Sequence, residues 1–391
     1  MSIIIRYILR ELGVTFLFGF VALTCVLLLV LLVLRASEEH ISLIYVWRII
    51  PFAFADASYI SLPIALLLAV TIFFSRMSGN NEVIALKALG VPPSTFLLPV
   101  FVIAFIASLI GVRIYEWAVT WGRPGITAVI YSNAEDMMIE RLRKDHYFET
   151  KNKQLTIMVQ GVDDQSRLIE PTIMLRKESA TIEARTAQIS IDSKADILKI
   201  KFVDMRVIRS TTRIIMPNEE ITISLSDFIP SGKSNRPSDM GLPQINEEKK
   251  KAVEQMEQQR RIIAAHRTFG ATMGSVDAWG TQQIKEAQAR IRSLQSYVNR
   301  LSVEPPRRWA TGFCCFFFVW IGAPLAIWMK KSDFFASFFA CFLPILLFYY
   351  PLLIFGLNQA KDGTLPPMCV WTANVGAGLV GLWFLRQIHR Y

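Results

Sequence analysis

Residues 27–34 read LLLVLLVL, and they close an apolar stretch that begins at Leu12. A helix needs about 20 mostly apolar residues to cross the hydrocarbon core of a membrane, and residues 12–34 provide that length. The stretch is too long for the apolar core of a signal peptide, and Arg35-Ala36-Ser37-Glu38-Glu39 follows it in place of a small-residue cleavage site. It therefore predicts a retained transmembrane helix.

Five further apolar stretches of comparable length follow, at about residues 51–74, 96–117, 309–329, 334–357 and 368–385. The composition agrees, because hydrophobic residues make up 52% of the chain and charged residues only 19%. Soluble domains carry about a quarter charged residues. The sequence therefore predicts an α-helical membrane protein with six transmembrane helices, three on each side of a large inserted region.

Lys and Arg are distributed unevenly over the short segments between these spans. If the N-terminus lies in the cytoplasm, the basic residues on that side are Arg6, Arg10, Arg76, Lys87, Lys330, Lys331, Arg386 and Arg390. The short segments on the other side hold only Arg35, Arg48 and Lys361. Because basic residues accumulate in short cytoplasmic loops, we expect both termini in the cytoplasm and residues from about 118 to 308 outside it.

The first part of the inserted region, residues 146–228, alternates apolar and polar residues. Leu155, Ile157 and Val159 show this period of two, which is typical of a strand with one buried face. Several such strands separated by polar breaks predict an antiparallel sheet. It would be either a small sandwich or an open, curved sheet whose edges need a partner or a cover. The region has no cysteine, so we expect it to fold without disulfides.

The second part of the region has a helical pattern. Residues 230–243 are rich in proline and indicate a linker, and helical stretches follow at about residues 246–265 and 281–302. The second stretch repeats apolar residues in steps of three and four, at Ile284, Ala287, Ile291, Leu294, Val298 and Leu301. We expect an antiparallel helical hairpin whose second helix ends at Pro305-Pro306. These patterns divide the chain at about residues 1–118, 119–230, 231–308 and 309–391.

No combination of side chains predicts catalysis, a cofactor or a metal site. The four histidines fall in unrelated segments, and the motifs G-x-S-x-G and H-E-x-x-H are absent. The nearest approach to a phosphate-binding loop, residues 231–234, has Asp227 where the Walker pattern requires glycine. The net charge of +10 lacks the aromatic–basic pattern of a nucleic-acid groove. We therefore expect a protein that is not an enzyme, binds no nucleic acid and leaves any ATP hydrolysis to another subunit.

The segment between the second and third spans, residues 76–93, predicts a helix of about two turns. Asn80 or Asn81 can cap it, Glu82 suits its positive N-terminal end, and Gly90 can end it. Its apolar residues are Val83, Ile84, Leu86 and Leu89. Two interpretations remain: a helix that rests on the lipid surface, or a coupling helix that enters a groove of a cytoplasmic motor and pairs Glu82 with a basic residue there.

Residues 62–68, Leu-Pro-Ile-Ala-Leu-Leu-Leu, and the 82–90 segment together resemble the lipopolysaccharide export permeases, the LptF/LptG (YjgP/YjgQ) family. Asn81 replaces the small or acidic residue usual before the glutamate of that family, whereas Lys87, Ala88 and Gly90 match its pattern. Other similar segments, in the same order as in the family, are residues 6–11, 186–207, 307–308, 322–326, 349–350 and 365–367. The resemblance covers about residues 1–230 and 303–391.

The resemblance implies a transmembrane permease subunit of an ABC transporter in the bacterial inner membrane. Such transporters extract lipopolysaccharide, or a related glycolipid, for export to the outer membrane. The subunit would pair with a second related permease and with a cytoplasmic ABC ATPase dimer. Its external domain would be an open β-jellyroll that passes the lipid to a periplasmic bridge protein of similar jellyrolls.

The resemblance also implies roles for single residues. Contacts with the ATPase would come from the short helix, at Glu82, Val83, Leu86 and Lys87, with Glu82 as the coupling carboxylate. Arg35 and Arg48 would contact phosphates of the lipid, although Arg35 also suits simple interfacial anchoring. The first and fifth spans would form a lateral gate.

The helical hairpin is an enlargement relative to the family, and the sequence does not choose a role for it. The sequence also does not decide whether the chain is the F-type or the G-type subunit, or whether it forms a homodimer or a heterodimer. Nor does it identify the glycolipid. An alternative from another class is a membrane-anchored envelope sensor or scaffold whose external β domain binds a ligand. That alternative expects neither an ATPase partner nor a bound lipid.

Overall fold

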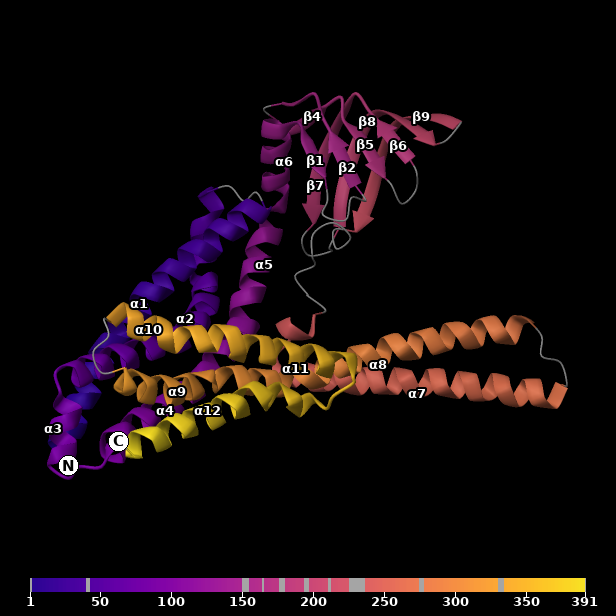
Figure 1. The fold of residues 1–391 in the computed structure, drawn as a ribbon. Helices are drawn as coiled ribbons and strands as arrows, with labels where there is room; N and C mark the ends of the chain where they lie inside the picture. Colours follow the sequence, from indigo (N-terminus) through magenta and orange to yellow (C-terminus); the bar gives the residue numbers. More distant parts are fainter. Residues whose placement is uncertain are drawn as a thin grey trace. The chain divides into compact units, whose positions relative to one another are not determined.

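The computed structural model describes residues 2–39, 43–149, 155–163, 165–175, 180–192, 197–209, 212–224, 236–273, 278–329 and 334–390 (Figure 1). The chain forms two compact units. The first comprises Met1–Leu27, Ala55–Thr120 and Arg236–Tyr391, and the second comprises Leu28–Phe54 and Trp121–Asn235.

Six helices within the described residues are long and apolar enough to cross a membrane: Ile3–Leu34, Val46–Gly79, Pro93–Ile130, Gln282–Trp328, Ala336–Asp362 and Pro367–Ile388. Three of them precede the strands and three follow them, which confirms the predicted three-plus-three arrangement. The third continues to Ile130, past the end predicted at residue 117. The helix continues through the π-helical segment Ala118–Gly122 and past Arg123 and Pro124, which open the next α-helical segment.

The first three spans consist of α1 (Ser2–Glu39), α2 (Leu43–Gly79) and the run of α4 (Pro93–Trp117), η1 (Ala118–Gly122) and α5 (Arg123–Ser132). A short helix, α3 (Glu82–Ala88), joins the second span to the third, and α6 (Ala134–Asp145) precedes the sheet. The last three spans consist of α8 (Ala278–Gly312) with α9 (Cys314–Trp328), α10 (Phe334–Pro344) with η4 (Ile345–Tyr349) and α11 (Tyr350–Asp362), and η5 (Pro367–Trp371) with α12 (Thr372–Arg390).

The core of the first unit is apolar, with Phe74, Phe96 and Phe318 almost completely buried. Polar side chains inside it bond to one another or to the backbone. The Tyr349 hydroxyl donates to Asn374 Oδ1 at 2.9 Å, and Asn374 Nδ2 donates to the Ala310 carbonyl at 2.9 Å. Because hydrocarbon offers no hydrogen-bond partner, such bonds allow polar side chains to lie inside the bundle.

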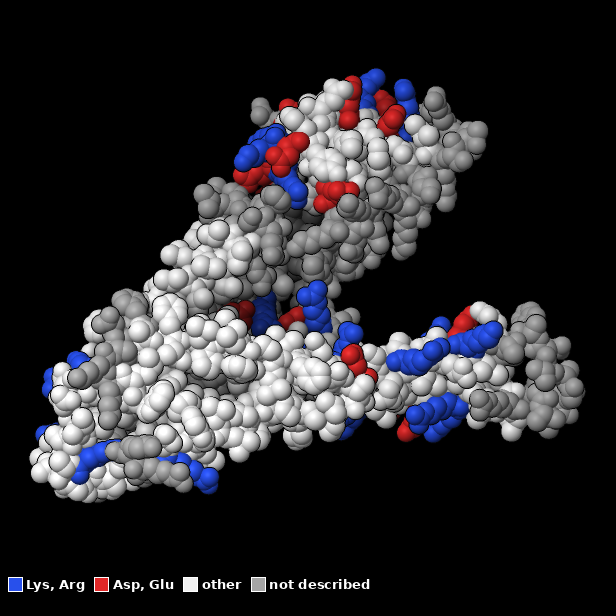
Figure 2. Space-filling model, viewed as in Figure 1, with Lys and Arg blue, Asp and Glu red and all other residues white. Residues whose placement is uncertain are grey.

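Most of the charged residues that Figure 2 shows on the first unit gather near the ends of its apolar helices and on the hairpin. Figure 2 shows a largely uncharged surface over these helices, with Lys and Arg side chains near the chain termini. Charges of both signs lie along α7 (Leu242–Met273) and α8. This pattern is the one expected of helices whose middle lies in lipid and whose ends lie in water.

The predicted helical hairpin consists of α7 and α8, which lie side by side and extend beyond α11 and α12 on the side away from the termini (Figure 1). The two helices join through a seam that includes Ala252, Met256 and Val298. Both helices are longer than predicted, since α7 begins at Leu242 and α8 continues to Gly312. On the exposed side of α7, the Glu248 carboxylate lies 3.1 Å from Lys251 Nζ and raises the pKa of that amine.

The prediction that Pro305-Pro306 ends the second helix of the hairpin is wrong, because α8 passes through both prolines. Each proline lacks the N–H that would donate to the carbonyl four residues earlier, so the carbonyls of Leu301 and Ser302 lose their helical partners. A helix tolerates such a gap where neighbouring segments support it. Here Leu301 is fully buried against Met240 and Ile245, so packing holds the helix together across the prolines.

The described strands of the second unit form a single antiparallel sheet. They are β1 (Tyr147–Glu149), β2 (Leu155–Met158), β3 (Gly161–Val162), β4 (Arg167–Ile169), β5 (Thr172–Leu175), β6 (Ala180–Glu183), β7 (Thr186–Asp192), β8 (Ile197–Arg209) and β9 (Thr212–Ser224). Their order is β1-β2-β5-β6-β8-β7-β4-β3, and β9 pairs with β8 on its other side.

The sheet curls at Asp204, in the middle of β8. Residues 197–203 of β8 pair with β7, whereas residues 206–209 pair with β6. Asp204 between them has a left-handed φ of 55°, which bends the strand so that the two halves of the sheet face each other. Their inward side chains, among them Ile157, Leu168 and Ile200, form one core together with Met138 and Leu142 of α6. Of the two predicted forms, the structure therefore has the curled sheet.

Candidate functional site

The short helix α3 begins at a sharp turn after α2. The Asn80 amide donates to the Arg76 carbonyl at 3.0 Å, and the Asn81 amide donates to the Ser78 carbonyl at 3.1 Å. Asn81 has a left-handed φ of 58°, and its side chain makes no capping hydrogen bond. Asparagine tolerates this conformation better than most residues. Asn81 therefore supplies the turn by its backbone, and not the side-chain cap that the sequence suggested.

The other end of α3 is a Schellman motif. The Val91 amide donates to the Leu86 carbonyl at 3.0 Å, and the Gly90 amide donates to the Lys87 carbonyl at 2.9 Å. Gly90 has a φ of 81°, which glycine adopts without steric cost. Pro92 and Pro93 then open α4. Both ends of α3 are thus set by backbone geometry, which fixes the direction of a helix of only seven residues.

One face of α3 packs against the core of the first unit. Val83 is 4% exposed and belongs to the core, and Leu86 is half-buried against it. Lys87, one position further, is also half-buried, and its Nζ donates to the Ile388 carbonyl at 3.0 Å. Ile388 lies near the C-terminus of α12, where carbonyls lack helical partners and a cation is favoured. Lys87 therefore connects α3 to the sixth span.

The opposite face of α3 is apolar and exposed. Ile84 is 49% exposed and Leu89 79% exposed, and Ala85 and Ala88 lie between them on the same side. Of the four predicted ATPase-contact residues, Glu82 is half-exposed, whereas Val83, Leu86 and Lys87 face inward. Sequence reasoning missed Ile84 and Leu89 as the outward residues. Successive residues lie about 100° apart around a helix. This rotation places Ile84 and Leu89 on one side and Val83 and Leu86 on the other, so the sequence could have indicated the two faces.

Glu82 occupies the first position of α3, where the helix dipole favours a carboxylate. The Asn80 side-chain amide donates to Glu82 Oε1 at 3.4 Å, a long contact that leaves the carboxylate accessible. Nearby, Arg76 at the end of α2 pairs with Glu11 of α1 at 2.7 Å. The turn before α3 is therefore attached to α1 as well as to α2.

Arg35 and Arg48, the predicted contacts for lipid phosphates, lie in α1 and α2 respectively. The side chain of Arg35 lies outside the described residues. Arg48 is exposed on the surface of its helix. Their role stays a prediction.

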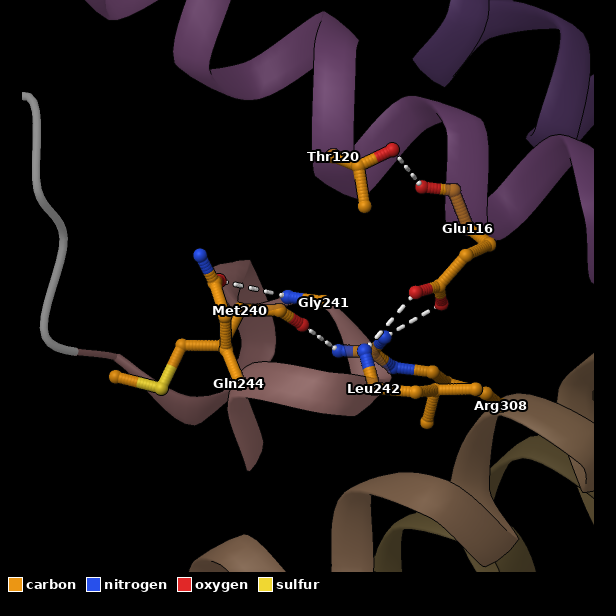
Figure 3. A network of polar contacts seen from close by, with 7 residues as sticks. All are labelled: Glu116, Thr120, Met240, Gly241, Leu242, Gln244 and Arg308. Atoms are coloured by element: carbon orange, nitrogen blue, oxygen red, sulfur yellow. Dashed lines mark hydrogen bonds and ion pairs between the residues drawn. The ribbon is translucent and has the colours of Figure 1, made fainter. Parts of the chain in front are cut away.

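A second group of polar residues, which sequence reasoning did not identify as a site, surrounds Arg308 (Figure 3). Arg308 is 1% exposed, and its Nη1 lies 2.6 Å from Glu116 Oε2 in α4. Its Nη2 donates to the Met240 carbonyl, and the guanidinium lies 5.6 Å from the centre of the Tyr115 ring. The Leu242 amide donates to the other Glu116 oxygen at 3.0 Å. We call Glu116, Arg308 and the 240–242 backbone the Arg308 clamp.

The Arg308 clamp satisfies a charge that would otherwise be costly inside the protein. Removing one partner of a buried ion pair typically costs about 3–5 kcal/mol, because the remaining charge stays desolvated. The clamp uses groups from three segments far apart in the sequence, at residues 116, 240–242 and 308. No sequence motif could have indicated it, because the pair forms only when α4 and α8 pack together.

The described residues do not form a metal-binding cluster. No group of three or more His, Cys, Asp or Glu side chains is placed there to hold a metal ion. The candidate site is a short helix with one anchored face and one exposed apolar face.

Comparison with known proteins adds the family. Residues 6–387 of the chain match the family described as lipopolysaccharide export system permease LptF/LptG. Among curated proteins, none matches the sequence.

Proposed function

Because the chain belongs to the LptF/LptG family of lipopolysaccharide export permeases, we propose that it extracts lipopolysaccharide, or a related glycolipid, from the bacterial inner membrane with energy from a separate cytoplasmic ATPase. Membership in the family makes the chain a multi-pass membrane protein and a transporter subunit, not an enzyme. The basic residues near both termini support an orientation with the termini in the cytoplasm and the sheet in the periplasm.

The observation that carries the coupling proposal is the two-faced structure of α3. Ile84 and Leu89 expose apolar side chains at one end of the membrane unit. An apolar helix face of this kind suits insertion into a groove of a partner protein. Glu82 is half-exposed at the start of the helix, and we propose that it pairs with a basic residue of the ATPase. In this proposal Ile84 and Leu89 bind the motor, and Val83, Leu86 and Lys87 transmit its movement.

The sheet domain would pass the lipid onward. Among the described strands, β1, β3 and β9 each pair with one neighbour only, so each presents an edge. A partner sheet can join such an edge by strand addition. These edges support the proposed contact with a periplasmic bridge protein of similar fold. A second related permease would complete the membrane part of the transporter.

Affinity purification of the full chain, expressed with its operon neighbours in gentle detergent, tests the proposal. We expect a cytoplasmic ATPase and a glycolipid to co-purify, both identified by mass spectrometry. With the variant Glu82→Ala, the lipid should stay bound to the chain, and the ATPase should hydrolyse ATP without causing lipid release. A chain that retains neither ATPase nor glycolipid would contradict the proposal and favour the envelope sensor.

A further inference from the structure

The third and fourth spans interlock over three successive helical turns. The contacts join Glu116 to Arg308, Val112 to Gly312, and Ser108 to Phe316. Each step is four residues on both helices, so the contacts follow one ridge of each helix. A Cβ added at Gly312 would lie 2.2 Å from Val112 Cγ2, and the Phe316 amide donates to Ser108 Oγ at 3.0 Å. This spacing leaves little freedom for one span to slide past the other.

The hairpin continues directly from the fourth span, but its connection contains a weak point. Pro305 and Pro306 remove two backbone hydrogen bonds from α8, between the hairpin and the membrane-spanning part. Kinks in helices commonly form at such prolines. Without further support, the hairpin could bend relative to the span at this position.

The 240–242 segment bridges the prolines from outside the helix. On the hairpin side, Met240 packs against Leu301. On the span side, the Met240 carbonyl and the Leu242 amide bind Arg308 and Glu116 (Figure 3). Gly241 lets the segment approach closely, because a Cβ there would lie only 3.3 Å from Thr120 Cγ2. The Arg308 clamp thus connects the base of α7 to both spans across the proline pair.

We propose that Arg308 is a positioning residue that holds the α7–α8 hairpin as a rigid arm on the third and fourth spans. The proposal rests on the proposed function, because it assigns the movement of the arm to lipid extraction. Since α3 leads into the third span through only residues 89–92, a movement of α3 driven by the ATPase would pass along the interlocked spans to the arm. The hairpin would then act on the far side of the membrane in step with the motor.

Spin-label distances on the full chain test the rigid arm without any partner. Labels at Gln258→Cys on α7 and Arg113→Cys on α4, both exposed positions, should give one narrow distance distribution once the exposed Cys25 and the half-buried Cys369 are replaced by serine. The paired variant Glu116→Gln/Arg308→Met removes both charges together, so that no buried charge is left alone. We expect it to broaden the distribution. A distribution as narrow as that of the unmodified clamp would overturn the proposal.

A disulfide across the clamp then separates positioning from mere stability. A Cβ at position 241 would lie 3.3 Å from Thr120 Cγ2, and a cysteine sulfur at position 120 can take the place of that methyl carbon. A disulfide with its S–S bond of about 2.05 Å brings each sulfur to a similar separation from the partner's Cβ. In the paired variant, lipid release per ATP should fall roughly two- to thirtyfold. Adding Thr120→Cys/Gly241→Cys should restore the narrow distribution and the release, and reduction should abolish both. Restored geometry without restored release would overturn the role assigned to the arm.

The surface pair Glu248–Lys251 on α7 provides the matched control. Glu248→Gln/Lys251→Met also removes one charge of each sign, but this exposed pair lies within α7 and does not span Pro305-Pro306. The distance distribution and the lipid release per ATP should therefore remain at the wild-type level. A change as large as that of the clamp variant would overturn the special role of Arg308. If the wild-type chain releases no lipid with its ATPase, the proposed function fails, and the label distances still decide whether the arm is rigid.

Discussion

Gly90 is the residue on which the end of α3 depends, because its φ of 81° lies in the left-handed region. A residue with a Cβ pays about 1–2 kcal/mol for that conformation. We therefore expect Gly90→Ala to lower the stability of the chain by about 1 kcal/mol, measured as a lower unfolding midpoint in detergent. Gly79→Ala is the control, since no atom would crowd its Cβ either, but its φ is not positive. Equal shifts for the two variants would contradict this explanation.

Lys87 is a second single residue with a testable role, which follows from its hydrogen bond to the Ile388 carbonyl. We predict that Lys87→Met retains the ATPase but reduces lipid release per ATP, roughly two- to tenfold, because α3 would no longer pull on the sixth span. Lys87→Arg keeps a cationic donor and should restore most of the release. Co-purification and release assays on the same preparations measure both effects. Loss of ATPase binding in Lys87→Met would instead indicate that Lys87 contacts the motor directly.

For the helix α3 as a whole, we predict that substitutions on its exposed face and on its buried face have different effects. Ile84→Ser and Leu89→Ser remove exposed apolar side chains, so the chain should unfold at the wild-type temperature. Each should weaken ATPase binding about tenfold or more, since burying a Leu or Ile side chain contributes about 1.5–3 kcal/mol. Val83→Ser, from the buried face, should lower the unfolding temperature instead. Binding assays and thermal unfolding together distinguish the faces, and a stable Val83→Ser variant that loses the ATPase would reverse the assignment.

The elements also show where local sequence signals stop. Asn80, Asn81 and Glu82 predicted the start of the short helix, and Gly90 with Pro92 predicted its end; α3 runs from Glu82 to Ala88, as expected. The same signals placed the end of a helix at Pro305-Pro306, where α8 continues. Local propensity favours a break there, but Leu301 packs against Met240 and Ile245, which are distant in the chain. Packing of distant segments outweighed the local preference.

For the whole molecule, the proposed orientation is open to direct labelling. In a background in which the exposed Cys25 and the half-buried Cys369 are both replaced by serine, Lys251→Cys and Arg10→Cys each add one thiol at an exposed position, on α7 and α1 respectively. A membrane-impermeant maleimide should label Lys251→Cys in cells with a permeabilised outer membrane, and Arg10→Cys only after lysis. The opposite pattern would reverse the topology and remove the basis for a cytoplasmic motor at α3.

The sequence by itself determined the membrane class, the six spans, the alternation that marks the sheet and the location of the short helix. These properties depend on the length and period of nearby residues, which any single segment displays. Only the tertiary structure decided which face of α3 is exposed, where Lys87 bonds, how β8 bends at Asp204, and that Arg308 meets Glu116. Those outcomes depend on contacts between segments far apart in the chain, and no local pattern records which partners will pack together.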